Sequence, residues 1–343
     1  LLGSPMQVVY LDFDSGDNGT IDYTPERRDL IQAEMEVIYQ DFSVAFTQEI
    51  PTGPYTTIVF NEGGAGSGAA EDIDFRNLNQ SDNAVLNVDG IGLLDEQIIP
   101  ASANIAAHEL GHLMGLRHAE IFGPIGSGVI AGFGPFYTPD YFGPQDAFEA
   151  YNHIMATGAF GAPLSTFVTP SWLSERSGVK LTYAEQGMTT DEVEDNDSIE
   201  TAQWLSYQSL TIPNTILDGV NAGVGDFSIS AMVVVGTLGG VADGRDVFRI
   251  EGRAGDLLNL EVLSNVCDRL SIDPIDPNIS VFNPDGSFVN YYGADAFNES
   301  ELETNDAAMV DFVLPTDGAY FVQVDSSNPN DSGNYELFVY RFN

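Results

Sequence analysis

The chain has 343 residues, more than one typical domain needs, so we expect two domains. Its 52 acidic and 11 basic residues give a formal net charge of −41, which argues against nucleic acids and anionic membranes as partners. Only one basic residue, Lys180, is a lysine, and an acidic, lysine-poor chain suits a saline environment where counterions screen self-repulsion. A highly soluble acidic surface is the simpler interpretation of the same charge.

The sequence contains no apolar run long enough to span a membrane and no signal peptide at its start. Cys267 is the single cysteine, so no disulfide forms within the chain, and we interpret it as a buried apolar residue. A secreted protein would have lost its leader before reaching this form. We expect a monomer.

The first part of the chain has an α/β pattern. Apolar spacing predicts strands at residues 6–14, 55–61 and 84–94, and helices at 24–47 and 102–115. Thr24 and Ser102 are the expected N-caps of the two helices, and Gly115 is the expected end of the second. Shorter helices are predicted at 145–151 and 169–179, around a long loop rich in glycine, proline and aromatic residues.

An acidic, polar segment at 188–202 marks the predicted domain boundary. Beyond it, apolar residues alternate in short runs that are separated by turn residues such as Pro-Asp-Gly and Thr-Asp-Gly. This pattern predicts an all-β sandwich at 189–343, after a first domain at 1–188.

The stretch His-Glu-Leu-Gly-His-Leu-Met-Gly-Leu-Arg-His runs from His108 to His118 and holds three of the four histidines in the chain. His108 and His112 are four residues apart, so a helix places them on one face. Gly115 can adopt a positive φ, end the helix and return the chain so that His118 reaches the same point. Three histidines with a fourth position open to water are typical of a catalytic zinc site.

Glu109 lies beside a predicted ligand but points away from the metal axis. From there its carboxylate can hydrogen-bond the attacking water, accept its proton and deliver that proton to the leaving amine. Zinc lowers the pKa of a bound water toward about 7 and polarises a carbonyl group, so the set is suited to amide hydrolysis.

His108, Glu109, His112, Gly115 and His118 match the H-E-x-x-H-x-x-G-x-x-H signature, and the chain therefore resembles a metzincin zinc peptidase. The resemblance implies an α+β catalytic domain with a twisted mixed sheet and an active-site helix. It also implies a methionine turn beneath the metal, for which Met155 is the counterpart.

The resemblance also implies that an edge strand binds substrate in extended form, and we place this strand within residues 84–94. Some metzincins carry a tyrosine two residues after the turn methionine, but Thr157 stands there, so no tyrosine ligand is assigned. His153 lies two residues before Met155. We expect it to be a hydrogen-bonding or substrate-pocket residue outside the zinc ligand set.

Residues 192–342 resemble the bacterial pre-peptidase C-terminal domain, which forms small β-sandwiches attached to secreted peptidases. The resemblance implies a jelly-roll-like sandwich that serves secretion or attachment to a substrate or surface. Four residues could supply oxygen ligands to a calcium ion: Glu194, Asn196, Asp197 and Asp246. A solvated acidic linker is an equally good interpretation of the first three.

The leading hypothesis is a secreted bacterial or archaeal zinc endopeptidase that hydrolyses proteins or peptides, with Glu109 as general base. One alternative is an adhesion or binding protein that uses a peptidase-like scaffold. Another is a zinc hydrolase that acts on a non-peptide amide. An intact Glu109 beside three histidines argues against the scaffold, because a scaffold has no need of the base.

Overall fold

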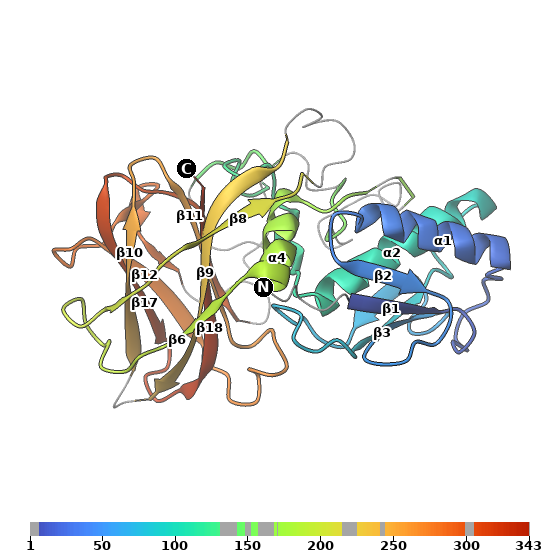
Figure 1. Cartoon of the computed structure of the whole chain (residues 1–343), viewed down its shortest axis with the longest axis horizontal. Helices are drawn as coiled ribbons and strands as arrows, with labels where there is room; N and C mark the ends of the chain where they lie inside the picture. Colours follow the sequence, from blue (N-terminus) through green and yellow to red (C-terminus); the bar gives the residue numbers. More distant parts are fainter. Residues whose placement is uncertain are drawn as a thin grey trace. The chain divides into compact units, whose positions relative to one another are not determined.

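The computed structural model describes residues 7–130, 143–147, 152–156, 168–169, 171–214, 225–240, 244–298 and 305–342. The chain forms two compact units, and strands predominate over helices among the described residues (Figure 1). The first unit holds Leu1–Ile121, Phe148–Gln186 and Pro213–Asp226; the second holds Phe122–Ala147, Gly187–Ile212 and Phe227–Asn343. The chain is therefore β-rich, and a single domain boundary at residue 188 stays a prediction.

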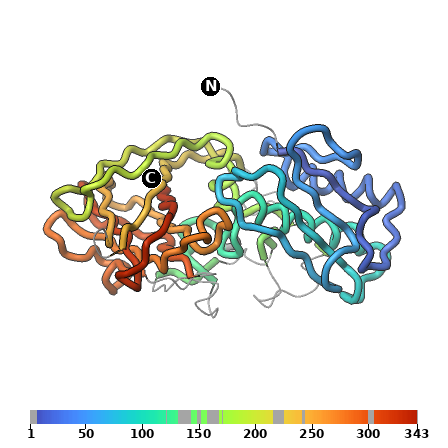
Figure 2. The backbone as a smooth tube through the Cα atoms, turned by 90° about the horizontal axis from the view of Figure 1, so that it is seen from below, coloured from blue at the N-terminus to red at the C-terminus, as the bar shows by residue number. Residues whose placement is uncertain are grey.

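The first unit contains a five-stranded mixed sheet in the order β2-β1-β3-β5-β4. The strands are β1 (Gln7–Asp12), β2 (Val44–Thr47), β3 (Thr56–Phe60), β4 (Ser67–Ala70) and β5 (Asn83–Asn87). The first four in the sheet order are parallel, whereas β4 runs antiparallel to β5 and forms an edge. The blue and cyan tube in Figure 2 traces this sheet and its helices.

Two helices pack against each other and against this sheet (Figure 1). α1 (Pro25–Ile38) begins at the Thr24 cap with a proline in its first turn, as predicted. α2 (Ile98–Leu113) is mostly buried and carries the first two histidines of the motif. The Tyr39 hydroxyl, just after α1, donates a hydrogen bond of 2.7 Å to the carbonyl of Ala107 in α2. No helix among the described residues is long and apolar enough to cross a membrane.

Both helix predictions need correction at one end. The first helix ends at Ile38, and Val44–Thr47 form β2, because the β-branched Val44 and Thr47 fit a pleated strand better than a helix. Ser102 is not a cap, since α2 already begins at Ile98. Its side chain is buried within the helix and shares a 3.0 Å hydrogen bond with the Tyr23 hydroxyl.

The predicted edge strand within 84–94 is wrong. β5 covers only Asn83–Asn87 and lies between β3 and β4, and η1 (Asp95–Gln97) leads from there to α2. The edge is β4, a short run of Ser, Gly and Ala whose composition gives little strand signal.

The two later helices also differ from the predictions. The helix expected at 169–179 starts later, as α4 (Glu175–Gln186). Of the helix expected at 145–151, residues 145–147 are described, and Gln145 and Asp146 form β-bridges to Gly128 and Ile130 instead. The rest of that range lies outside the described residues.

The second unit contains two larger sheets, and every regular element described from Thr189 onward is a strand. One sheet has the order β15 (Phe297–Asn298), β12 (Pro277–Phe282), β17 (Gly318–Ser326), β10 (Arg245–Gly252), β7 (Gln203–Trp204). The other sheet has the order β16 (Ala307–Val313), β11 (Leu257–Leu263), β18 (Ser332–Phe342), β9 (Phe227–Gly239), β6 (Thr189–Asp191). β8 (Gln208–Ile212) also pairs with β9. β13 (Asn290–Tyr291) and β14 (Ala294–Asp295) form a separate two-stranded sheet. The sheets contact each other through β11, β12, β15 and β16 and enclose an apolar core.

A buried carboxylate of the second unit holds residues that follow the histidine motif in sequence. Oδ2 of Asp311 accepts the backbone N–H groups of Gly126 and Gly128, each at 2.9 Å. Asp311 has a φ of 49° beside a register shift between β11 and β16. β-bulges re-aim side chains in this way, and nothing in the sequence pattern predicted this contact.

Candidate metal centre

His108 and His112 project from successive turns of α2, and each is oriented by a backbone carbonyl. Nδ1 of His108 lies 2.8 Å from the carbonyl oxygen of Ile154, and Nδ1 of His112 lies 2.8 Å from that of Leu116. A carbonyl oxygen only accepts hydrogen bonds, so both Nδ1 atoms carry the proton. In the neutral rings, Nε2 is then left with a bare lone pair.

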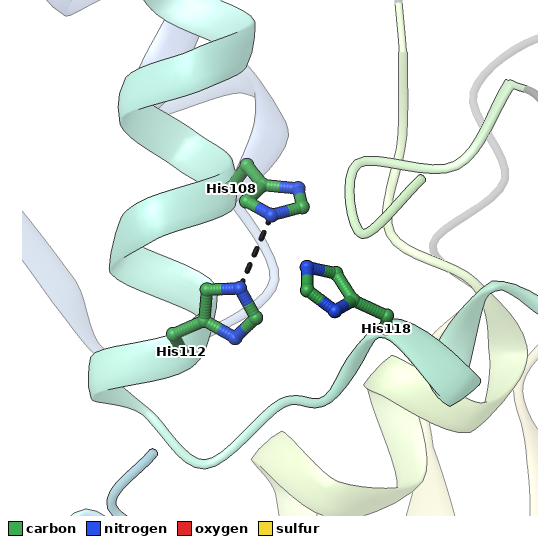
Figure 3. Close-up of side chains that lie close together, drawn as sticks. All are labelled: His108, His112 and His118. Carbon is green, nitrogen blue, oxygen red and sulfur yellow. Dashed lines mark hydrogen bonds between the residues drawn. The ribbon is translucent and has the colours of Figure 1, made fainter. Parts of the chain in front are cut away.

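Gly115 brings the third histidine to the same point. Its φ is 90°, and a Cβ there would lie 2.5 Å from the Cα of Phe75, so both conformation and space require glycine. α2 ends just before it, and His118 opens the short helix η2 (His118–Ile121). The ring of His118 has its centroid 4.8 Å from that of His112 and 5.3 Å from that of His108 (Figure 3).

The three rings could hold a metal ion. One nitrogen from each lies within 4.8 Å of the others, and no other group of three or more His, Cys, Asp or Glu side chains in the described part of the chain is so close. Nε2 of His108 and Nε2 of His112 are 3.1 Å apart, the contact dashed in Figure 3. A tetrahedral ion with nitrogen ligands at about 2.0–2.1 Å requires roughly 3.3 Å between them.

The neutral form of His108 suits this role. Burial, followed by the neighbouring His112 and His118, lowers the pKa of His108 well below its ordinary value. Because its Nδ1 carries the proton, a neutral His108 presents the Nε2 lone pair toward Nε2 of His112, 3.1 Å away. A metal ion could accept that lone pair.

Glu109 is buried beside the edge strand β4. Its carboxylate accepts the backbone N–H of Ala70, and burial raises the pKa of Glu109 to about 8. A Cβ at Gly68 would clash with this carboxylate. Glycine at position 68 therefore allows the strand to lie against the predicted base.

The predicted methionine turn lies under α2. Met155 is fully buried, and its Sδ would be 2.5 Å from a Cβ at Gly111, so the glycine makes room for the sulfur. The N–H of Ile154 donates to the carbonyl of Trp172 at 2.8 Å, which fixes the turn whose carbonyl orients His108. Thr157 lies outside the described residues.

His153 is buried in the same turn but does not belong to the group of three histidines. Its ring packs edge-on against that of Trp172, with centroids 6.0 Å apart. A role in a substrate pocket stays a prediction.

Four positions that shape the centre were not predicted from the sequence. Gly68 and Gly111 allow close approaches, and the carbonyls of Leu116 and Ile154 orient the rings. A glycine inside a helix, which costs about 1 kcal/mol relative to alanine, was a usable signal for Gly111. Carbonyl contacts leave no trace in residue identity.

The residues considered for calcium are only partly brought together. Asn196 is 1% exposed, and neither polar atom of its amide has a hydrogen-bond partner. The backbone carbonyl of Asn196 accepts the N–H of Val247 at 2.9 Å, which places Asn196 beside the buried Asp246. Glu194 and Asp197 are exposed and do not converge with Asp246 into a group of three carboxylates.

No family model matches the chain, and no curated protein matches its sequence. Among solved structures, the pre-peptidase C-terminal domain of a Bacillus anthracis collagenase is 21% identical, covering 31% of this chain and 86% of that one with a TM-score of 0.24. High choriolytic enzyme 1, a hatching enzyme zinc-protease from the medaka fish Oryzias latipes, is 15% identical. The match covers 43% of this chain and 67% of that one, with a TM-score of 0.23.

A periplasmic inhibitor of g-type lysozyme from Aeromonas hydrophila is 15% identical, with 33% of this chain and 86% of that one covered and a TM-score of 0.23. At such TM-scores these likenesses carry no functional argument. The case for function therefore rests on the geometry of the three histidines and Glu109.

We predict that Gly111→Ala destabilises the protein by about 1–3 kcal/mol, because the new methyl group displaces Met155. In a Met155→Ala background the same change should be neutral or stabilising by up to about 1 kcal/mol, since alanine is the better helix former. Chemical unfolding of the four proteins measures the coupling. Equal destabilisation in both backgrounds would show that the glycine is not there for the methionine.

Glu109→Gln is expected to stabilise the metal-free protein increasingly as the pH rises from 4.5 to about 8. Burial raises the folded-state pKa, so the folded protein holds this proton more tightly and loses stability as the carboxyl ionises. Thermal unfolding of both metal-free proteins across this range tests it, with the exposed Glu96→Gln as a control for net charge. A stability difference that does not change with pH contradicts the burial of the carboxylate.

Proposed function

We propose that this protein is a zinc-dependent endopeptidase that hydrolyses proteins or peptides, with His108, His112 and His118 as ligands and Glu109 as general base. The observation that carries the proposal is the convergence of three histidine rings, with Nε2 of His108 and Nε2 of His112 3.1 Å apart and Nδ1 of both rings 2.8 Å from a backbone carbonyl. Three histidine ligands leave one tetrahedral position open, which suits catalysis better than structural support.

A zinc ion at this point would polarise the scissile carbonyl and make a water acidic enough to attack at neutral pH. Glu109 accepts a proton from the attacking water and passes it to the leaving amine, which departs neutral as the C–N bond breaks. The N–H of Ala70 holds the Glu109 carboxylate while it does so. The positive charge of a bound ion would also lower the pKa of the buried Glu109 and favour its ionised form.

The open edge of β4 supports an extended peptide as substrate. The N–H of Glu71 bonds the carbonyl of Asn83 at 3.0 Å, so this pair is hydrogen-bonded in the antiparallel ladder. Hydrogen-bonded and non-hydrogen-bonded pairs alternate, so the N–H and carbonyl of Gly68 and Ala70 point to the open edge. The N–H of Ala70 bonds the Glu109 carboxylate. The N–H and carbonyl of Gly68 could pair with a substrate backbone next to this carboxylate.

The site and the composition together favour a protein that acts outside the cell. The net charge of −41 and the single lysine support a saline environment, and we extend the proposal to a secreted bacterial or archaeal monomer. The second unit would then serve secretion or attachment, as a pre-peptidase C-terminal domain does. A scaffold for adhesion and a hydrolase of non-peptide amides remain the competing hypotheses.

The activity test compares wild type, Glu109→Ala and a matched control, Glu185→Gln. Glu185 is a half-buried carboxylate of the first unit, whose Oε1 accepts the N–H of Ser43 at 2.5 Å. Wild type and control should cleave a denatured protein and lose activity to a chelator. Glu109→Ala should retain zinc and be at least a hundredfold slower, the lower range for general base catalysis.

Full proteolysis by Glu109→Ala would refute the mechanism. Wild-type protein that holds no metal and cleaves nothing would favour the scaffold. Zinc-dependent hydrolysis of small amides without cleavage of proteins would favour the amidase.

We further propose that Asn196 and Asp246 hold a calcium ion, for which Glu194 and Asp197 stay predicted further ligands. The buried Asn196 amide without partners supports this, because such a group is costly unless a ligand satisfies it. Calcium at a hundred times its dissociation constant should stabilise the second unit by about 2.7 kcal/mol.

This calcium effect should vanish in Asn196→Ala and persist in the exposed Asp273→Asn, as thermal unfolding with and without calcium would show. Equal calcium responses in the two variants would contradict the assignment.

A further inference from the structure

The single lysine of the chain is buried next to the histidine motif. Lys180 in α4 has a side chain only 2% exposed, and its Nζ lies 2.7 Å from Oε1 of Glu120, which is 8% exposed. The other ten basic residues are all arginines. Burying a lysine and a glutamate removes both from water, and the pair rarely stabilises a fold more than apolar residues of the same size would. Stability alone is therefore a weak reason for this buried pair.

Glu120 holds the turn that carries the third histidine. Its Oε2 accepts the backbone N–H of Arg117 at 2.5 Å, and its own N–H donates to the carbonyl of Arg117 at 3.1 Å. These two bonds close a ring around His118. The Ser174 hydroxyl, at the start of α4, donates to the carbonyl of Glu120 and adds a second tie to the same helix.

Lys180 also contacts the other end of this segment. Its Nζ lies 5.7 Å from the centre of the Phe75 ring, close enough for a cation–π interaction. The backbone of Phe75 packs against Gly115, where the chain leaves α2. One ammonium group thus touches partners at both ends of the path from Gly115 to Glu120.

We propose that Lys180 is a positioning residue of the metal centre. By pairing with Glu120, it holds the Arg117–Glu120 turn so that His118 stays in reach of the ion that His108 and His112 bind. The inference rests on the proposed zinc site, and it assigns a role to α4 that the histidine motif does not contain. A compact ammonium suits the position, because it meets the carboxylate and the aromatic ring from one point.

The test uses the full chain and a neutral pair, Lys180→Met with Glu120→Gln, which removes both charges of the pair together. Lys180→Met alone removes one charge of a buried pair and could unfold the protein, so the double variant decides. The matched control is Arg269→Met with Glu336→Gln, an ion pair of 3.0 Å in the second unit whose glutamate side chain is 2% exposed.

Three measurements are made on each protein: the rate of zinc loss to a chelator, the visible spectrum of the cobalt-substituted form, and hydrogen exchange at the amides of Arg117 and Glu120. We expect the neutral pair to lose zinc about tenfold faster than wild type, the lower range for partners that orient ligands. Its cobalt spectrum should shift, and its Arg117 amide should exchange faster. The control should change thermal stability only.

Zinc loss within about threefold of wild type in the folded double variant would overturn the inference while the proposed function stands. Faster loss in the control by the same factor would also overturn it, because the effect would then follow from stability alone. Wild-type protein that binds no zinc would overturn both this inference and the proposed function.

Discussion

The candidate metal centre of the first unit depends on the orientation of two imidazole rings. The carbonyls of Ile154 and Leu116 take the Nδ1 protons of His108 and His112, which leaves the Nε2 atoms facing each other at 3.1 Å. A metal ion could take both nitrogens as ligands. The helix spacing, the turn at Met155 and the exit of the chain from α2 all serve to maintain this arrangement, and His118 completes it.

Three glycines allow other segments to approach the centre. Gly111 admits the sulfur of Met155, Gly115 admits the backbone of Phe75, and Gly68 admits the carboxylate of Glu109. Each lacks a side chain at a point where a Cβ would meet an atom of the centre or its support. Close packing around α2 therefore fixes the rings, Glu109 and the edge strand relative to one another within one unit.

The convergence of the three histidines was predictable from sequence because it depends on local spacing: His108 and His112 are four positions apart, and a glycine precedes His118. The cap at Thr24 and the β-rich second unit followed from local patterns as well. The strand at Val44–Thr47 and the edge strand at Ser67–Ala70 could not be predicted from local patterns, because tertiary pairing overrides a weak or ambiguous local preference. Contacts such as that of Lys180 with Glu120 join residues sixty positions apart, which no single-sequence pattern encodes.

The central claim is that the three histidines hold a zinc ion with one position left open. X-ray absorption at the zinc edge, together with metal analysis of the purified full chain, tests it most directly. We expect about one zinc per chain, bound by three imidazole nitrogens at about 2.0–2.1 Å and one further light atom. A chain that retains no zinc, or a zinc ion bound without histidine, would contradict it.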